Sequence, residues 1–274
     1  MKTNKKLNTL IVLLILAVSL FPFWIMLNVS LMNTSEAISS QPHILVQHPS
    51  LDNYINVFMS ESSPWVKYFV NSFVVAMATA TVSTLLAIFS GYSLARLSFI
   101  GKTTISNSFY VIYMFSGLLL LVPLYRIISS VGLYGTRTSL VLAMVVQTLP
   151  TAVFMMKSFY ENIPEELEEA ALVDGLNRFQ VILKIIMPIS INGIVSSFVY
   201  CAMIAWNDYL FASVFLKLPE NFTIALGLNN LFSMPDKIWG EMMAVSLLTS
   251  VPIVVMYAIS QRLINDDVTK GGIK

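Results

Sequence analysis

The chain has 274 residues, of which 56% are hydrophobic and only 11% are charged, and its formal net charge is +1. Soluble domains carry charge on about 25% of their residues, so this chain has too little charge to cover a water-facing surface. The near-neutral balance also argues against a basic surface for nucleic acid. The composition therefore predicts a protein that is embedded in a lipid bilayer.

The N-terminal segment begins like a secretory signal, because Lys2, Lys5 and Lys6 precede an apolar run that starts at Leu7. The apolar character continues to about Leu31, however, which is roughly 25 residues and too long for the apolar core of a signal peptide. We therefore expect an uncleaved first membrane span.

Six stretches are long and apolar enough to cross a bilayer, which takes roughly 20 residues at about 1.5 Å each. They lie at residues 8–31, 68–95, 106–130, 138–160, 186–215 and 239–264. Backbone amides in hydrocarbon must pair within their own segment, and the alternating pattern of a membrane barrel is absent, so helices are expected throughout. The expected fold class is an all-α polytopic membrane protein, with six transmembrane helices in a single domain over residues 1–274.

The distribution of cations predicts the orientation. Six spans place both termini, the second loop and the fourth loop on one side of the membrane. That side holds eleven of the sixteen cations, namely Lys2, Lys5, Lys6, Arg96, Lys102, Lys157, Arg178, Lys184, Arg262, Lys270 and Lys274. The other side holds five, namely Lys67, Arg126, Arg137, Lys217 and Lys237. The positive-inside rule makes the first side cytoplasmic, so both termini are expected inside.

Two sizeable loops then face outward, at about residues 33–65 and 217–238. The first contains His43 and His48, five residues apart and without a nearby cysteine, so no metal site is expected there. The single cysteine, Cys201, lies in an apolar stretch and is expected to be a small buried side chain.

The fourth loop, residues 161–185, carries six of the fifteen acidic residues of the chain within residues 161–174. Pro164 suits the first turn of a helix, Gly175 suits a left-handed turn at its end, and Asn177 suits the cap of a second helix. The loop therefore predicts a short amphipathic helix with a small-residue face, a glycine turn, and a second helix that enters the membrane at Pro188. On charge alone, a solvated connector remains the alternative.

The amino-acid sequence of this loop resembles a known motif. Glu169-Ala170-Ala171 is followed at fixed spacings by Gly175, Ile185 and Met187-Pro188. The pattern resembles the EAA motif of permeases from binding-protein-dependent ABC importers, with Met187 in place of leucine, a swap that conserves volume. The resemblance implies that residues 161–185 form the coupling loop, the segment on which a cytoplasmic ATPase docks.

Other stretches resemble the carbohydrate branch of that family, and most of all its maltose-permease G-type subunits. They are Asn71-Ser72, Gly91 to Arg96, Pro123-Leu124-Tyr125, Ala205 to Leu210, and the tail from Gln261-Arg262 to Lys270-Gly271-Gly272. The resemblance implies the type I importer permease fold, a heterodimer with a homologous permease, two cytoplasmic ATPases and an extracytoplasmic solute-binding protein. It also implies that a sugar is the cargo and that ATP and Mg²⁺ are bound by the partner ATPases, so that this chain has no cofactor of its own.

The chain shows no ATP site of its own. Gly101-Lys102-Thr103 looks like the end of a phosphate-binding loop, but the first glycine that this loop requires is replaced by Arg96, and no buried strand precedes it. Motifs of a hydrolase nucleophile or of a zinc protease are also absent from the sequence. The chain is therefore expected to be a transport subunit and not an enzyme.

Two groups of site residues follow. The resemblance implies coupling to the ATPase for Glu169, Ala170, Ala171, Asp174, Gly175, Arg178, Ile185 and Pro188, with Gly175 as the natural hinge. Side chains within the spans that are candidates for the translocation pathway are Asn71, Gln147, Asn192, Trp206, Asn207 and Asp208. The alternative for each polar one is contact between helices, and for Trp206 it is core packing.

Two other functions compete with sugar import. A permease of the same family could carry glycerol phosphate, an amino acid or a peptide. A secondary carrier acting alone is the other alternative, but the centres of the spans hold almost no ionisable residue that could couple to an ion.

Overall fold

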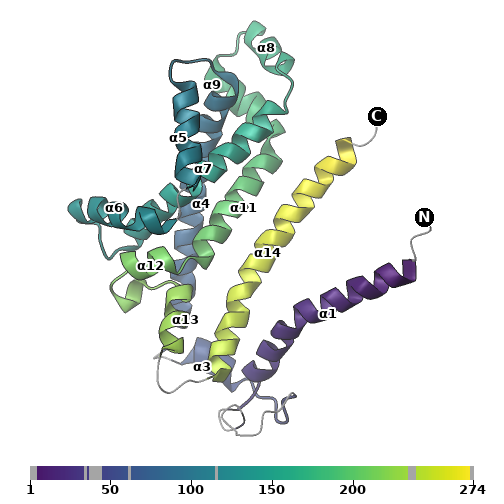
Figure 1. Cartoon of the computed structure of the whole chain (residues 1–274), viewed down its shortest axis with the longest axis vertical. Helices are drawn as coiled ribbons and strands as arrows, with labels where there is room; N and C mark the ends of the chain where they lie inside the picture. The colour runs from purple at the N-terminus through teal and green to yellow at the C-terminus, as the bar shows by residue number, and fades with distance from the viewer. Residues whose placement is uncertain are drawn as a thin grey trace. The chain divides into compact units, whose positions relative to one another are not determined.

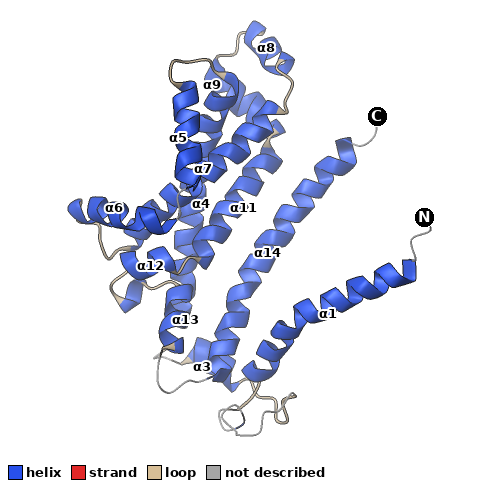
Figure 2. Ribbon diagram, in the orientation of Figure 1, coloured by secondary structure: helices blue, strands red, loops and turns tan. Residues whose placement is uncertain are grey.

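The computed structural model describes residues 5–33, 36, 45–60, 63–114, 117–233 and 239–271. The regular structure of these residues is helical, and the expected all-α fold class is confirmed (Figure 2). The contacts within the chain fall into two compact units, and the single domain over residues 1–274 stays a prediction. Unit 1 comprises residues 1–67 and 227–252, and unit 2 comprises residues 68–226 and 253–274.

Unit 1 is built around the end of the first helix. Its helices are α1 (Lys5–Ser30) and α3 (Asp52–Met59), with parts of α4 (Trp65–Arg96), α13 (Ile224–Phe232) and α14 (Trp239–Gly271). The large apolar side chains of α1 are exposed, as expected of a helix in lipid. The last carbonyls of a helix need partners. The Asn53 amide of α3 donates to the carbonyl of Ser30, the last residue of α1 (2.9 Å), and to that of Met32 just beyond the helix (2.8 Å).

Unit 2 contains most of α4 and the helices that follow it. These are α5 (Lys102–Met114), α6 (Gly117–Ser130), α7 (Arg137–Glu161), α8 (Glu166–Val173), α9 (Arg178–Val181), the π-helix η1 (Ile182–Ile186), α10 (Met187–Ile189), α11 (Ile191–Asn207), α12 (Leu210–Phe215) and the 3₁₀ turn η2 (Pro219–Asn221). Figure 1 shows α8 and α9 at one end of this unit and α12 toward the other.

Among the described residues, four helical segments are long and apolar enough to span a membrane: Leu7–Ser30, Trp65–Arg96, Arg137–Glu161 and Trp239–Gln261. They coincide with the first, second, fourth and sixth expected spans. The third and fifth were expected to be continuous, and that is wrong. Each consists of a bent pair, at 106° between α5 and α6 and at 81° between the segment Arg178–Ile189 and α11. The described helices therefore give six spans when each bent pair counts as one.

The break in the third span falls at residues 115–116, which lie outside the described residues, whereas the break in the fifth span has a local cause. In the fifth span, Pro188 cannot donate to the preceding turn, and the chain bends at Ser190. This span was also expected to reach residue 215, but α11 ends at Asn207. The Asp208 carboxylate that follows accepts from the backbone N–H groups of Phe211 (3.4 Å) and Ala212 (2.9 Å), which starts a new helix.

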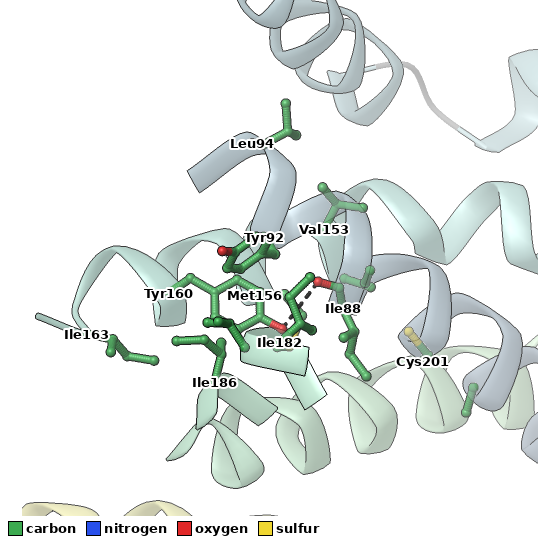
Figure 3. Packing of buried hydrophobic residues seen from close by; sticks show 14 of the residues in the cluster. Ile88, Tyr92, Leu94, Val153, Met156, Tyr160, Ile163, Ile182, Ile186 and Cys201 are labelled. Atoms are coloured by element: carbon green, nitrogen blue, oxygen red, sulfur yellow. Dashed lines mark hydrogen bonds between the residues drawn. The ribbon is translucent and has the colours of Figure 1, made fainter. Parts of the chain in front are cut away.

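The core of unit 2 lies where α4, α7 and the π segment meet. Its largest buried side chains include Tyr92, Met156, Tyr160 and Ile186 (Figure 3). A Cβ atom on Gly91 would lie 2.8 Å from the Cβ of Met156, so only glycine lets α4 approach α7 this closely. The core therefore anchors the end of the unit from which the coupling loop projects.

Candidate functional site

The coupling loop folds as two short helices joined by a glycine turn. The first helix is α8, and Gly175 follows it with φ +89°, the left-handed conformation that favours glycine. The N–H groups of Gly175 and Leu176 donate to the carbonyls of Leu172 and Ala171, both at 3.1 Å. This is the Schellman pattern that closes a helix. The predicted glycine turn is confirmed.

The second helix begins at Asn177, as predicted. The Asn177 side chain accepts from the N–H of Gln180 (2.9 Å), and the Gln180 side chain accepts from the N–H of Asn177 (3.0 Å), which forms a capping box. The chain then runs through the π-helix η1 and past Pro188 into α11. Since π-helical turns are rare and frequently lie at functional sites, this passage is a candidate functional segment.

The exposure of α8 separates its outer from its inner side chains. Leu167 (45% exposed), Ala170 and Val173 (87%) are exposed, and they recur every three residues, so they share an outer face. Glu168 and Ala171 are buried. The expected small-residue face is therefore wrong for Ala171, which belongs to the core of the chain itself.

Of the remaining residues implied by the motif, Glu169, Asp174, Gly175 and Arg178 lie near this turn and are exposed, so they are accessible to a partner protein. Ile185 lies in η1 and packs half-buried against the core, and Pro188 lies in α10 and is exposed.

A buried ion pair that the sequence analysis did not predict holds α8 in place. Arg96 Nε donates to Glu168 Oε1 at 2.7 Å, and Arg96 Nη1 donates to Glu165 Oε1 at 3.1 Å. Arg96 Nη2 donates to the carbonyls of Tyr160 (2.7 Å) and Ile163. The sequence shows both partners, because Arg96 ends an expected span and Glu165 and Glu168 lie in the acidic run of the fourth loop. Nothing in the sequence, however, indicates that they pair.

Three of the six candidate pathway residues have structural contacts. Asn71 is buried, and its amide donates to the carbonyls of Glu220 (2.9 Å) and Phe222 (3.0 Å) while its oxygen accepts from Arg137 (3.0 Å). Trp206 is buried edge-on against Phe69. Asp208 starts α12. For these residues the structure shows packing or contact between segments.

The other three candidates differ in their surroundings. Asn192 is half-buried, and Asn207 is exposed at the end of α11, where its amide donates to the Met203 carbonyl (3.0 Å). Gln147 lines a cavity of about 90 Å³, together with Thr151 and Tyr200.

A second, open cavity of about 480 Å³ adjoins the first at Thr151. Its lining includes Tyr110, whose ring stacks on Phe154 with centroids 4.2 Å apart, and Ser158. The α7 residues Gln147, Thr151, Phe154 and Ser158 recur at helical spacing, so they form one face, which we name the α7 stripe. The stripe presents an amide, two hydroxyl groups and an aromatic ring to the two cavities.

The fold is that of a multi-pass, all-helical membrane protein. Among the described residues, no cluster of three or more His, Cys, Asp or Glu side chains could hold a metal ion. His43 lies outside the described residues, and His48 is exposed.

Comparison with known proteins supplies the family. Residues 83–270 match the family described as "Binding-protein-dependent transport system inner membrane component". The chain is 50% identical over 279 aligned positions to the inner membrane ABC transporter permease protein YcjP of Escherichia coli (strain K12), and the match covers all of both chains. The chain therefore belongs to the family of inner-membrane permeases from binding-protein-dependent ABC importers.

More distant proteins agree with this. The trehalose/maltose transport system permease protein MalG of Thermococcus litoralis is 27% identical over 264 positions, which cover 96% of this chain and 94% of the relative. A solved bacterial ABC transporter involved in the import of alginate has a TM-score of 0.80 at 16% identity, covering 93% of this chain and 94% of the other, and it shows the same fold. The chain is thus the permease of an importer that also needs an ATPase and a periplasmic binding protein, and it is not itself the ATPase.

Proposed function

We propose that this permease forms half of the pathway for a sugar or oligosaccharide. The cargo is supported by the trehalose/maltose permease of T. litoralis, which matches nearly the whole chain. The other half of the pathway is a homologous permease, and two cytoplasmic ATPases drive the pair. Residues 161–185 receive one ATPase, and a binding protein delivers the sugar from outside.

The α7 stripe is the observation that best supports a sugar pathway through this permease. Sugars are neutral and rich in hydroxyl groups, so a site for them offers neutral hydrogen-bonding groups and aromatic faces. The stripe supplies these through Gln147, Thr151 and Phe154, and Tyr200 and Tyr110 add two phenol groups from other helices. Lys157 also lines the larger cavity, but it pairs with Glu161 at 3.6 Å, so its charge is partly balanced.

The outer face of α8 is the proposed docking surface for the ATPase. Leu167, Ala170 and Val173 form an exposed apolar strip, and Glu166 and Glu169 flank it with negative charge. Apolar contact with a partner would bury the strip, while the acids would meet cations at its rim. Closure of the ATPase dimer would then move α8, and the helix after Gly175 would carry that motion into α11.

The decisive experiment identifies the cargo. The permease is purified with its partner permease, ATPase and binding protein, and placed in proteoliposomes. Binding protein loaded with trehalose, maltose or an oligosaccharide is expected to stimulate ATP hydrolysis and uptake of that sugar. Stimulation by an amino acid, a peptide or glycerol phosphate, with none by sugars, would reject the sugar assignment. Uptake driven by an ion gradient without the ATPase would instead support a secondary carrier.

A further inference from the structure

The side chain of Arg96 joins three elements at the base of the coupling loop. It leaves the last residue of α4 and is only 7% exposed. The carbonyl of Tyr160 in the last turn of α7, the carbonyl of Ile163 just beyond α7, and the carboxylate of Glu168 in α8 all accept hydrogen bonds from it. One guanidinium group therefore caps α7 and binds α8 at the same time, in a planar geometry that lysine cannot reproduce.

Glu168 is held on both of its oxygens by the same helix. Oε1 accepts from Arg96, and Oε2 accepts from the hydroxyl group of Tyr92 at 2.8 Å. Tyr92 and Arg96 are four residues apart, so they lie on one face of α4. The Glu168 side chain is 5% exposed, which leaves little room for water to replace either partner.

Burial of this kind adds little stability compared with an apolar contact, but it fixes geometry. A buried ion pair costs about as much to desolvate as it returns, whereas its directional hydrogen bonds allow one arrangement. The other connections of α8 to unit 2 are its two ends and the apolar side chains of Ala171 and Leu172, which pack against the core. The hydrogen bonds from Arg96 and Tyr92 are thus the directional links between α8 and a long membrane helix.

We propose that Arg96 is a positioning residue that locks the coupling helix α8 to the end of α4. A displacement of α8 then enters the membrane along two routes, through α9 to α11 and through α4. The inference rests on the proposed docking of the ATPase on residues 161–185. It adds that α4 moves with α8 throughout the transport cycle.

The variants separate charge from geometry. Arg96→Met/Glu168→Leu removes both charges with side chains of similar size, so no buried charge is left unpaired. Arg96→Lys keeps the charge and loses the planar fork. Arg126→Met is the matched control, because Arg126 is an exposed arginine on α6, away from the lock.

Assembly and coupling are measured on the full complex in proteoliposomes. The double variant is expected to copurify with wild-type amounts of ATPase, because the outer face of α8 is unchanged. Sugar uptake per ATP hydrolysed is expected to fall about tenfold, within the range of about 5- to 150-fold that couplings between sites typically span. Arg96→Lys is expected to fall between wild type and the double variant, and Arg126→Met to match wild type. Wild-type uptake per ATP in either Arg96 variant would overturn the proposal, and so would loss of ATPase copurification.

A distance measurement between spin labels tests whether α8 and the end of α4 stay fixed to each other, which is the proposed lock. Spin labels at Ser98→Cys, just beyond α4, and Glu166→Cys, at the start of α8, both replace exposed residues, whereas the native Cys201 is fully buried. In the wild-type background the label distance is expected to be narrow and equal with and without ATP, and in the double variant it is expected to broaden. A nucleotide-dependent shift in the wild-type background would refute the lock. Failure of the wild-type chain to copurify an ATPase would instead refute the proposed function, and the label distance would still report on the lock.

Discussion

Replacing Ala170 or Ala171 by tryptophan separates the docking surface of α8 from the core that holds this helix. Ala171 is 6% exposed and packs in the same cluster as Tyr160, Ile163 and Val181. Ala170, its neighbour, is exposed. The same substitution at adjacent positions therefore meets the interior in one case and the partner surface in the other.

The burial of each alanine decides the expected change in permease stability. Ala171→Trp overfills a packed site, which costs about 1–3 kcal/mol of permease stability. Ala170→Trp changes a surface residue, so the stability of the free permease is expected to stay within about 0.5 kcal/mol of wild type. In the complex, however, a misfit at Ala170 of about 1–3 kcal/mol would weaken ATPase binding, where each 1.4 kcal/mol is a factor of about ten.

The assay combines thermal unfolding of the purified permease with ATPase copurification from membranes. Ala171→Trp is expected to lower the unfolding temperature, while Ala170→Trp is expected to leave it unchanged and to lose the ATPase. Equal destabilisation by the two variants would show that both side chains are buried. Normal unfolding, copurification and uptake in Ala170→Trp would remove the outer face of α8 from the docking surface.

Three further predictions test the loop, the outer end of α4 and the orientation. Gly175→Val places a β-branched side chain at φ +89°, which costs about 1–3 kcal/mol. The variant is expected to insert into the membrane normally but to lose uptake. Wild-type uptake would show that the glycine turn is dispensable. Asn71→Ala leaves two backbone carbonyls without their donor, which costs about 1–3 kcal/mol, so it is expected to lower the unfolding temperature. The sugar concentration that half-saturates uptake is expected to stay unchanged. A change in that concentration would show that Asn71 belongs to the translocation pathway. Reporter fusions after Lys102 and Lys270 are expected to report the cytoplasm and one near His48 the outside, and an outside signal at Lys102 would overturn the orientation.

Hydropathy predicts where helices lie because the bilayer demands long apolar segments with paired backbones. It does not predict how those helices bend. Each bent pair is apolar enough to pass as one span when its two halves are taken together, so a search for long apolar segments does not reveal the break. Pro188 was a visible signal, but the π-helix before it depends on packing that the sequence does not display.

In the coupling loop, the features formed by neighbouring residues were predictable from the sequence, and the contacts with distant residues were not. The turn at Gly175 and the cap at Asn177 involve residues within a few positions of each other, so their residue types predicted them. The inward direction of Ala171 was not predictable, because two adjacent alanines give no sign of which one faces the core. The pairing of Arg96 with Glu168 joins residues 72 positions apart, and it emerges only when α4 and α7 pack together.

One helix carries both of the polar clusters at the ends of unit 2. Asn71 binds the segment around Glu220 and Phe222, and Arg96, 25 residues further along α4, binds the coupling loop. At about 1.5 Å per residue these clusters are about 38 Å apart, which exceeds the roughly 30 Å hydrocarbon core and places each near an interface. A single helix, α4, runs from one cluster to the other without a proline inside it. An importer must make the state of its outer face depend on the state of its inner face, and linkage requires this dependence to be reciprocal. Under the proposal that Arg96 joins α8 to α4, this connection runs through one helix that is held by hydrogen bonds at both ends, whereas the route through α9 and α10 passes through the 81° break at Ser190.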